Sequence, residues 1–408
     1  MKQIALLSLL AALMASCAQP ERSLVNAAHL GHLYEEVVAG SDTLGTIWIY
    51  CEAPDYHHVG DEDEGFTCLD DVARALVFYC REYKRHPSTE ILEKIRSLTA
   101  FVLHMQAPNG YFHNFMLPGN EINTTHPNSV AIPGWWTWRA MWALSELNLL
   151  EEAQLADLQT QSRQLIDSLV VKMEGLCPNP ADTLVFDGIP VPACFTEMLG
   201  ADQAGVILIA LANHFQMAPS PRLKDLMLGI GNLTLRMQLG DADTWPYGAF
   251  LSWRNYWHAW GNLQAYGLLF AGKTIQHQPF IDAGLREVRH FYPYFLEKGH
   301  FAGFKAVQEA DGLNMQEFNQ FPQIAYNIRP MVFASLEAFS ITGDSTFLQT
   351  ARHLADWLSG ENPAGERMYD PSTGRTFDGI ISPEQINRNS GAESTIEALL
   401  TIQAYGIH

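Results

Sequence analysis

The sequence predicts an all-α fold in which six helical hairpins close into an (α/α)6 toroid. Three observations lead to this prediction. Apolar helical segments recur at intervals of about 55 to 67 residues, and such self-similarity is typical of repeat architectures. Each apolar segment alternates with an amphipathic one. The links that precede the apolar segments are long, whereas the links that follow them are short. We therefore expect an inner ring of six apolar helices inside an outer ring of six amphipathic helices.

The most informative apolar segment begins at Leu69. Asp70 and Asp71 open a run that is apolar on nearly every face, and Arg74 interrupts this run one turn later. A helix that is apolar all round is buried, and acidic residues in its first turn suit the positive end of the helix dipole. We expect a buried helix whose charged N-terminus faces a pocket. The alternative is that Asp70 or Asp71 only caps the helix.

The remaining elements repeat this alternation along the chain. Amphipathic helices are expected at 23–39, 89–106, 151–173, around 223–230, 279–297 and 345–358. Apolar helices are expected at 69–83, 135–147, 201–215, 257–271, 323–339 and 391–405. The long connections are 40–68, 107–134, the segment from 174, 240–256, 299–322 and 359–390. Long loops in a compact domain are usually functional. All six lead into apolar helices, so we expect the site at that end of the toroid.

The N-terminus is typical of an exported bacterial lipoprotein. Lys2 precedes an apolar stretch at 4–14, and Met14-Ala15-Ser16-Cys17 resembles a lipobox. This pattern predicts a signal peptide at 1–16 and a lipid anchor on Cys17, followed by a short tether at 17–22. The membrane is then contacted through the anchor only, and the localisation is the bacterial cell envelope. The alternative is a plain cleaved secretory signal, which also implies export.

Composition favours one acidic domain over residues 23–408. No Pro/Ser-rich linker, low-complexity tract or charge block divides it. The net charge is −20, and it becomes −21 when Lys2 is removed with the signal peptide, which argues against a nucleic-acid partner. Five cysteines follow Cys17, and none has CxxC spacing, so we expect no structural zinc and mostly buried, inert thiols. No metal or other cofactor is predicted, and the oligomeric state is left open.

Two stretches carry a resemblance to a known superfamily. These are Thr67 to Ala75 (TCLDDVARA) and Asn389 to Thr395 (NSGAEST), and together with the hairpin pattern they resemble the six-hairpin glycosidases. The resemblance covers the whole mature chain and implies an (α/α)6 toroid catalytic domain that acts on carbohydrate. That superfamily includes glucoamylase-like and unsaturated-uronyl hydrolases, and related toroids occur in polysaccharide lyases. No single catalytic family is implied.

Aromatic residues gather in two bursts at the expected pocket end. Seven of the ten tryptophans lie there, at 135, 136, 138, 245, 253, 257 and 260. Aromatic faces stack on the apolar faces of sugars, but they also pack between helices. We expect Trp135, Trp245 and Trp253 to bind substrate together with Tyr256, and we expect tryptophans in helix interiors to belong to the core.

Four carboxylates are the candidate catalytic groups. Glycoside hydrolysis uses one carboxyl to protonate the leaving oxygen and one to activate water or attack. Asp70, Asp71, Asp202 and Glu393 all fall at or near the starts of apolar helices. Adjacent helical positions diverge by about 100°, so Asp70 and Asp71 cannot both point into one site. Glu393 also fits a capping box with Ser390, which is an equal alternative to catalysis.

Arginines recur near the starts of the apolar helices, at 74, 139, 254, 329 and 388. Arginine suits bidentate capture of a carboxylate, which favours a uronic-acid-containing glycan bound by Arg139, Arg254 and Arg388. The equal alternative is that these arginines neutralise buried aspartates.

Three hypotheses for function follow. The first is a glycoside hydrolase that acts on poly- or oligosaccharides, with a preference for uronates. The second is a polysaccharide lyase, in which a His or Tyr base abstracts a proton beside a carboxylate that Arg or Asn neutralises. The candidate residues for this chemistry are the stretch Asn255-Tyr256-Trp257-His258 together with His113, His126 and Tyr326. A single histidine in an aromatic stretch is more often structural, however, and His258 is also a candidate substrate ligand. The third is a lipoprotein that binds glycans without turnover.

Overall fold

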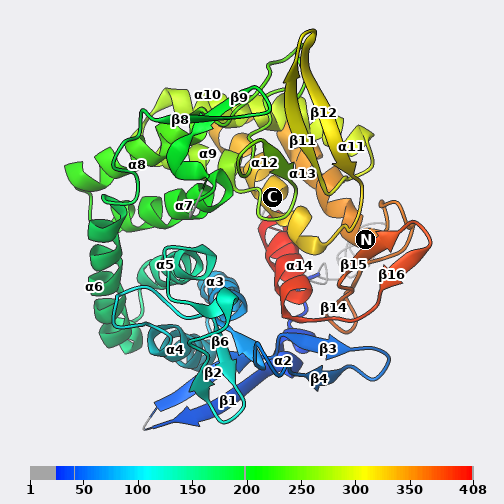
Figure 1. Cartoon of the computed structure of the whole chain (residues 1–408). Coiled ribbons are helices and arrows are strands. Elements are labelled where there is room, and N and C mark those ends of the chain that lie inside the picture. The colour runs from blue at the N-terminus through cyan, green and yellow to red at the C-terminus, as the bar shows by residue number, and fades with distance from the viewer. Residues whose placement is uncertain (1–23, 41, 197–198, 407–408) are drawn as a thin grey trace, which may run out of the picture.

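Six helices form a closed inner ring in the computed structural model, which describes residues 24–40, 42–196 and 199–406. Each inner helix packs against the next, and the last returns to the first (Figure 1). The inner helices are α3 (Leu69–Arg85), α5 (Trp135–Asn148), α7 (Ala201–Met217), α9 (Gln264–Ile275), α12 (Arg329–Thr342) and α14 (Ala392–Tyr405). The predicted toroid is confirmed by this arrangement.

The outer ring covers the inner one hairpin by hairpin. Except for α11, which packs on α13, each outer helix packs on the inner helix of its own hairpin, and the short helix α2 packs on α14. The outer elements are α2 (Ala28–Leu33), α4 (Thr89–His104), α6 (Ala156–Met173), α8 (Pro221–Leu235), α10 (Gln278–Arg286), α11 (Tyr292–Glu297) and α13 (Ser345–Ala355). A π-helical turn, Glu287–Phe291, joins α10 to α11.

Burial distinguishes the two rings. Helix α3 is buried continuously from Asp71 to Cys80, as expected for an element with apolar side chains on all faces. Helix α4 instead buries one face, with Leu92, Ile95 and Leu98 inside. Ser88 caps α4 by accepting a hydrogen bond from the backbone N–H of Ile91. Hydrophobic patterning therefore places each helix in its ring.

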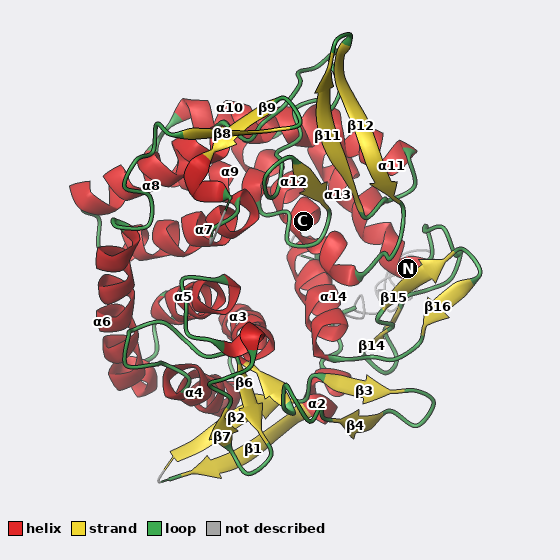
Figure 2. Cartoon of the chain, in the orientation of Figure 1, coloured by secondary structure: helices red, strands yellow, loops and turns green. Residues whose placement is uncertain are grey.

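Small antiparallel sheets occupy the long connections (Figure 2). Four hairpins are β1 (Tyr34–Ala39) with β2 (Asp42–Ile47), β3 (Tyr50–Glu52) with β4 (His57–Val59), β8 (Thr183–Phe186) with β9 (Ile189–Pro192), and β15 (Gly379–Ser382) with β16 (Gln385–Asn387). Strand β13 (Tyr369–Asp370) pairs with β14 (Arg375–Thr376). Two three-stranded sheets are β5 (Thr67–Cys68), β6 (Phe115–Leu117) and β7 (Glu121–Ile122), and β10 (Tyr256–His258), β11 (Gly303–Glu309) and β12 (Gly312–Asn319).

Several predicted element boundaries were wrong. The expected helix at 23–39 is helical only at Ala28–Leu33, because Tyr34–Ala39 pairs with β2 along its whole length. The expected helix at 257–271 begins at Gln264, because Tyr256–His258 pairs with β11. The expected loop at 299–322 contains the long hairpin of β11 and β12. The helix expected from 323 begins at Arg329, after a 3-10 turn at Ala325–Asn327.

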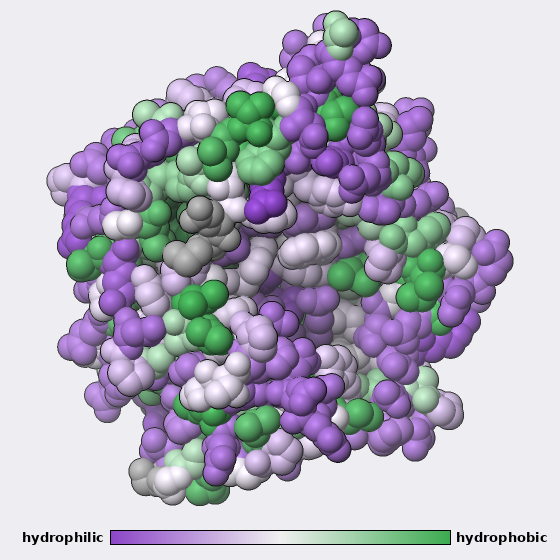
Figure 3. All heavy atoms as spheres, in the orientation of Figure 1, coloured by the Kyte–Doolittle hydropathy of each residue, from purple (hydrophilic) through white to green (hydrophobic). Residues whose placement is uncertain are grey.

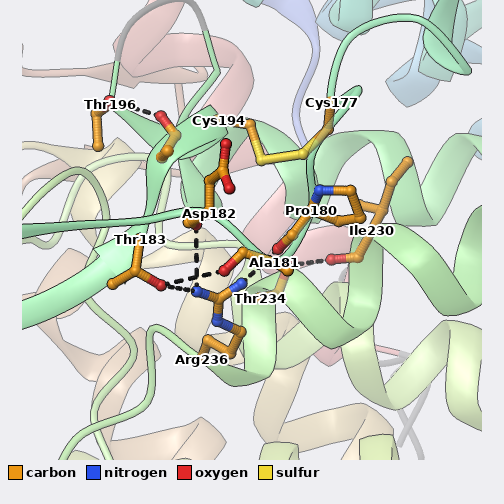
Figure 4. Close-up of a disulfide and its surroundings, with 11 residues drawn as sticks. Cys177, Pro180, Ala181, Asp182, Thr183, Cys194, Thr196, Ile230, Thr234 and Arg236 are labelled. Carbon is orange, nitrogen blue, oxygen red and sulfur yellow. Dashed lines mark hydrogen bonds between the residues drawn. A yellow bond between two sulfur atoms is a disulfide. The ribbon is translucent and has the colours of Figure 1, made fainter.

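The structure contains a disulfide that the sequence analysis did not assign. Cys177 and Cys194 form a disulfide between the end of α6 and the segment after β9 (Figure 4). Cys51, Cys68 and Cys80 are free and buried, in line with the expectation of inert thiols. In the described part of the chain, no helix combines the length and the hydrophobicity that a membrane span requires.

Candidate active site

A cleft lies where the N-termini of the inner helices meet the strand-bearing connections. It has three adjoining sections that share lining residues. The outer cavity, of about 690 Å³, shares Trp135 and Trp260 with a middle cavity of about 380 Å³. The middle cavity shares Tyr326 and Glu393 with a small cavity of about 170 Å³. Figure 3 shows that the middle of the ring is hollowed and largely surrounded by hydrophilic residues.

Arg74 is the electrostatic centre of this end of the ring. Its buried guanidinium lies 2.9 Å from Asp70, 2.6 Å from Asp71, 3.2 Å from Glu393 and 2.9 Å from Glu397. The first two partners come from its own helix α3, and the other two come from α14. The network thus joins the first inner helix to the last. It also shows that Arg74 neutralises carboxylates, which was one of the two predicted roles.

Asp70 and Asp71 have different environments, as expected for adjacent helical positions. Asp71 is buried beside Arg74 and the thiol of Cys68, which lies 3.2 Å from its Oδ2. Burial raises the pKa of Asp71, and the charge of Arg74 opposes this effect. Asp70 instead lines the middle cavity, with Oδ1 3.4 Å from the Nε of Arg139. Neither side chain caps α3, because the cap is the Cys68 sulfur, which accepts from the backbone N–H of Asp71.

Glu393 is the second carboxylate of the middle cavity. The N-cap of α14 is Gly391, whose N–H is bonded to Asp378, so the capping-box alternative for Glu393 is not observed. Glu393 is half-buried, and 44% of its side-chain surface remains exposed at the cleft. Burial raises the pKa of Glu393 to about 7, the guanidinium of Arg74 opposes this, and the neighbouring carboxylates reinforce it.

The carboxyls of Asp70 and Glu393 are close to each other. Asp70 Oδ2 lies 2.9 Å and Glu393 Oε2 lies 3.2 Å from the same Nη2 of Arg74, so these two oxygens are no more than about 6 Å apart. The Asp70 carboxyl contacts the guanidinium groups of both Arg74 and Arg139, whereas the Glu393 carboxyl has a raised pKa. Pairs of titratable groups whose environments differ in this way are typical of acid–base sites.

Arg139 and Tyr326 also line the middle cavity. A nitrogen of Arg139 donates a hydrogen bond to the Tyr326 hydroxyl, and the guanidinium lies over the rings of Trp135 and Tyr326 at 5.3 and 5.0 Å. Burial lowers the pKa of Arg139 to about 10, so it remains a cation at neutral pH. Its Nη1 has no hydrogen-bond partner among the described residues. Arg329 is fully buried and bonded to Glu397, away from the cleft.

Asp202 and His258 form a separate pair in the outer cavity. His258 Nε2 lies 3.1 Å from Asp202 Oδ2, and its Nδ1 lies 2.7 Å from the carbonyl oxygen of Trp260. A carbonyl oxygen only accepts hydrogen bonds, so Nδ1 must carry a proton. The Nε2 side of the ring therefore faces the Asp202 carboxyl, and the imidazole is stacked on Trp260 at 3.7 Å.

No protein-family model matches the sequence, and no curated protein matches it significantly. Solved structures match its fold over nearly the whole chain. A cellobiose 2-epimerase from Bacillus thermoamylovorans B4167 is 10% identical with a TM-score of 0.66, covering 93% of this chain and 95% of that chain. A D-mannose isomerase is 10% identical with a TM-score of 0.60, covering 96% and 100%. An inactive variant of an α-1,6-mannanase of Salegentibacter sp. HEL1_6, in complex with α-1,6-mannotriose, is 10% identical with a TM-score of 0.54, covering 89% and 93%.

The chain therefore has the (α/α)6 toroid fold that these solved structures share. At such low identities the likeness concerns the fold alone. The roles of individual residues in this toroid therefore rest on its own geometry.

The toroid brings most of the predicted site residues to the cleft. Asp70, Arg139 and Glu393 line the middle cavity. The outer cavity is lined by Asp202, Trp253, Arg254, Tyr256 and His258, and Trp135 lines both cavities.

Other predicted residues lie elsewhere. Trp245 packs against Phe304 at 5.2 Å, and Arg388 pairs with Glu366 at 2.6 Å, and neither lines the cleft. Asp71 is buried behind the cleft floor. Cys17 lies outside the described residues.

Sequence reasoning did not assign functional roles to several residues that line the cleft. Trp260 stands in the second tryptophan burst but was expected inside a helix, and its exposure of 40% follows from the turn that precedes α9. Lys305 and Glu317 lie on the β11–β12 hairpin, which was expected to be a loop. Asp378 reaches the small cavity from the strand-bearing connection before α14. In the described ranges, no group of three or more His, Cys, Asp or Glu could hold a metal ion.

Proposed function

We propose that the protein is a glycoside hydrolase that acts on oligo- or polysaccharides. The observation that carries this proposal is the pair of Asp70 and Glu393 on the floor of the cleft. Both carboxyls line the same cavity and contact the same guanidinium nitrogen. Canonical glycosidases use two carboxyl groups on either side of the scissile bond, one as acid and one as base or nucleophile. The carbohydrate-active enzymes that share the fold support this class of substrate.

Glu393 is the proposed general acid. A pKa of about 7 leaves a substantial fraction of the carboxyl protonated at neutral pH, which a proton donor to the leaving oxygen requires. Asp70 is the proposed nucleophile or base, because Arg74 and Arg139 hold its carboxylate in a fixed position. The upper limit of about 6 Å between their oxygens favours retention, for which the carboxyls are about 5–5.5 Å apart, over inversion, which needs about 6.5–9.5 Å.

Aromatic side chains supply the proposed sugar platform. Trp135 and Trp260 lie 6.0 Å apart where the outer and middle cavities meet. The outer cavity has a volume typical of small-ligand sites, so it can hold the sugar units next to the scissile bond.

A polysaccharide lyase is the second candidate, and the environment of Tyr326 favours it. Three guanidinium groups, those of Arg74, Arg139 and Arg329, lie 5.0 to 5.5 Å from its ring. The Tyr326 hydroxyl accepts a hydrogen bond from Arg139, so its own proton stays available for exchange with a substrate. A tyrosine in such a setting can act as a base beside a carboxylate that an arginine neutralises.

The distinguishing experiment is turnover of a panel of neutral and acidic polysaccharides by the mature protein. We expect new reducing ends without absorbance in the near ultraviolet, since a lyase would leave an unsaturated product that absorbs there. Glu393→Gln and Asp70→Asn should each lower kcat at least 100-fold while the proteins stay folded, and Arg388→Gln should leave it unchanged. Parent activity should fall above about pH 7 as Glu393 loses its proton.

Three results would contradict the proposal. They are unsaturated products, glycan binding without any turnover, and near-parent rates in both carboxyl variants. The first supports the lyase, and the second supports the lipoprotein that only binds glycans.

We also propose that Cys17 carries a lipid anchor in the bacterial cell envelope, on the evidence of Met14-Ala15-Ser16-Cys17. Mass spectrometry of the mature N-terminus should find a diacylglyceryl group on Cys17. An unmodified N-terminus would contradict this proposal.

A further inference from the structure

Arg254 differs from the other arginines that were predicted to bind substrate. Arg139 contacts Asp70, and Arg388 pairs with Glu366. Arg254 lines the outer cavity, yet no described carboxylate lies within ion-pair distance of it, and its buried Nε has no hydrogen-bond partner. A buried donor without a partner is costly, so this guanidinium is suited to a ligand that brings an acceptor.

Aromatic rings hold the Arg254 guanidinium in place. It lies 3.9 Å from the ring centroid of Trp253 and 5.2 Å from that of Phe186. The backbone of Arg254 has a φ of +49°, in a tight turn closed by mutual hydrogen bonds between Trp253 and Tyr256. Residues held in such uncommon conformations cluster at ligand sites. The planar guanidinium of Arg254 is therefore held in position before a ligand arrives, which lowers the entropic cost of binding.

The other charges of the outer cavity are already paired. Lys305 lies 3.0 Å from Asp187 and 3.5 Å from Glu317, so these acids are partly neutralised. The Asp202 carboxyl lies 3.1 Å from Nε2 of His258. Arg254 is thus the cation without a carboxylate partner among the described residues that line this cavity.

We infer that Arg254 binds the anionic group of an acidic sugar, at a subsite removed from the scissile bond. The planar guanidinium suits the two oxygens of a uronate carboxylate, and a sulfate ester offers the same oxygen chemistry. The substrate class is then an acidic glycan whose charged unit occupies the outer cavity while its neighbour reaches Asp70 and Glu393. This inference rests on the proposed function for the identity of the ligand as a glycan.

Calorimetric binding tests the inference without turnover. The background is Glu393→Gln, so that the probes stay intact. The acidic probes are trimers of galacturonate, trimers of mannuronate and desulfated chondroitin tetrasaccharide, and their carboxyl-reduced counterparts are the neutral controls. A sulfated galactan oligomer tests the second source of the anion. Arg254→Gln removes the positive charge, and Arg254→Lys keeps the charge but removes the planar guanidinium with its paired N–H donors. Arg388→Gln is the matched control outside the cleft.

Arg254→Gln should raise the Kd of at least one acidic probe about 10- to 100-fold and leave its reduced counterpart within twofold. Arg254→Lys should recover only part of the loss, and Arg388→Gln should match the parent. If Arg254→Gln fails to fold, Arg254→Lys alone must still weaken acidic probes selectively. A response confined to the sulfated probe assigns the anion to a sulfate ester.

In the binding experiment, either of two results would overturn the inference: equal losses for acidic and reduced probes, or no binding of any anionic probe by the background protein. Selective binding through Arg254 without turnover in the parent would overturn the hydrolase proposal alone. Turnover that is indifferent to Arg254 would overturn this inference alone.

Discussion

Glu287 offers a direct test of how burial controls charge in this toroid. Its side chain is fully buried in the π-helical turn between α10 and α11. One oxygen accepts a hydrogen bond of 2.9 Å from the backbone N–H of Phe250, in the connection that leads to Trp253. The other oxygen has no partner among the described residues. Burial raises the pKa of Glu287 to about 8, and the Phe250 hydrogen bond opposes this effect.

Replacement of Glu287 by glutamine keeps a side-chain oxygen that can accept the hydrogen bond from Phe250, and it removes the ionisable carboxyl. Because the folded pKa lies above that of the unfolded chain, the neutral acid stabilises the fold fully below about pH 4.5. That stabilisation is lost as the pH rises through 8. Proton linkage changes the free energy of unfolding by about 1.4 kcal/mol per pH unit for one such group. Between pH 5 and pH 8, the free energy of unfolding of the parent should therefore fall by up to about 4 kcal/mol relative to that of Glu287→Gln.

Urea unfolding of both proteins at pH 5, 7 and 9 measures this difference, since other titrating groups are common to both and cancel. Glu297→Gln, at an exposed position near the end of the same outer-ring segment, is the matched control and should track the parent. Parallel stability curves for the parent and Glu287→Gln from pH 5 to pH 9 would refute the reasoning.

Two further predictions concern stability. Arg74→Met leaves buried Asp71 without a basic partner and removes one of the two arginines that contact Glu397, so it should cost about 3–5 kcal/mol in urea unfolding. Arg388→Met, at an exposed pair, should stay within about 0.5 kcal/mol, and equal effects would contradict the central role of Arg74. Joint replacement of Cys177 and Cys194 by serine removes a cross-link that spans 17 residues and should cost about 3 kcal/mol. The parent treated with reductant should match this double variant in thermal unfolding, and a parent that is indifferent to reductant would argue against the bond.

The ring of helices could be predicted because its signal is local. Continuous burial from Asp71 to Cys80 appears in the sequence as an apolar run that only Arg74 interrupts, and no distant residue is needed to interpret it. The segment Tyr34–Ala39 shows the limit of this approach. It was read as amphipathic helix, but its β-branched Val37 and Val38 pair with Leu44 and Thr43 of the neighbouring strand. Tertiary pairing overrides a weak local preference in such cases.

The candidate site could be predicted only in part, for a related reason. The sequence indicated that Asp70 and Asp71 must diverge, but the burial that separates them comes from Cys68, Arg74 and the rest of the ring. The sequence also indicated that Arg254 lies near a pocket, but it could not show which arginines already have carboxylate partners. That distinction depends on carboxylates contributed by distant segments, such as Glu393 and Glu397 for Arg74.

Closure of the ring has a consequence for how the protein matures. Arg74 and Glu397 are in contact although 323 residues separate them along the chain. Glu393, the proposed acid partner of Asp70, therefore reaches the cleft floor only when α14 docks beside α3. A chain in which these two helices are not yet in contact has no complete cleft floor. Under the proposed function, turnover would therefore begin only after α14 has closed the ring, and it would report that the first and the sixth inner helices have met.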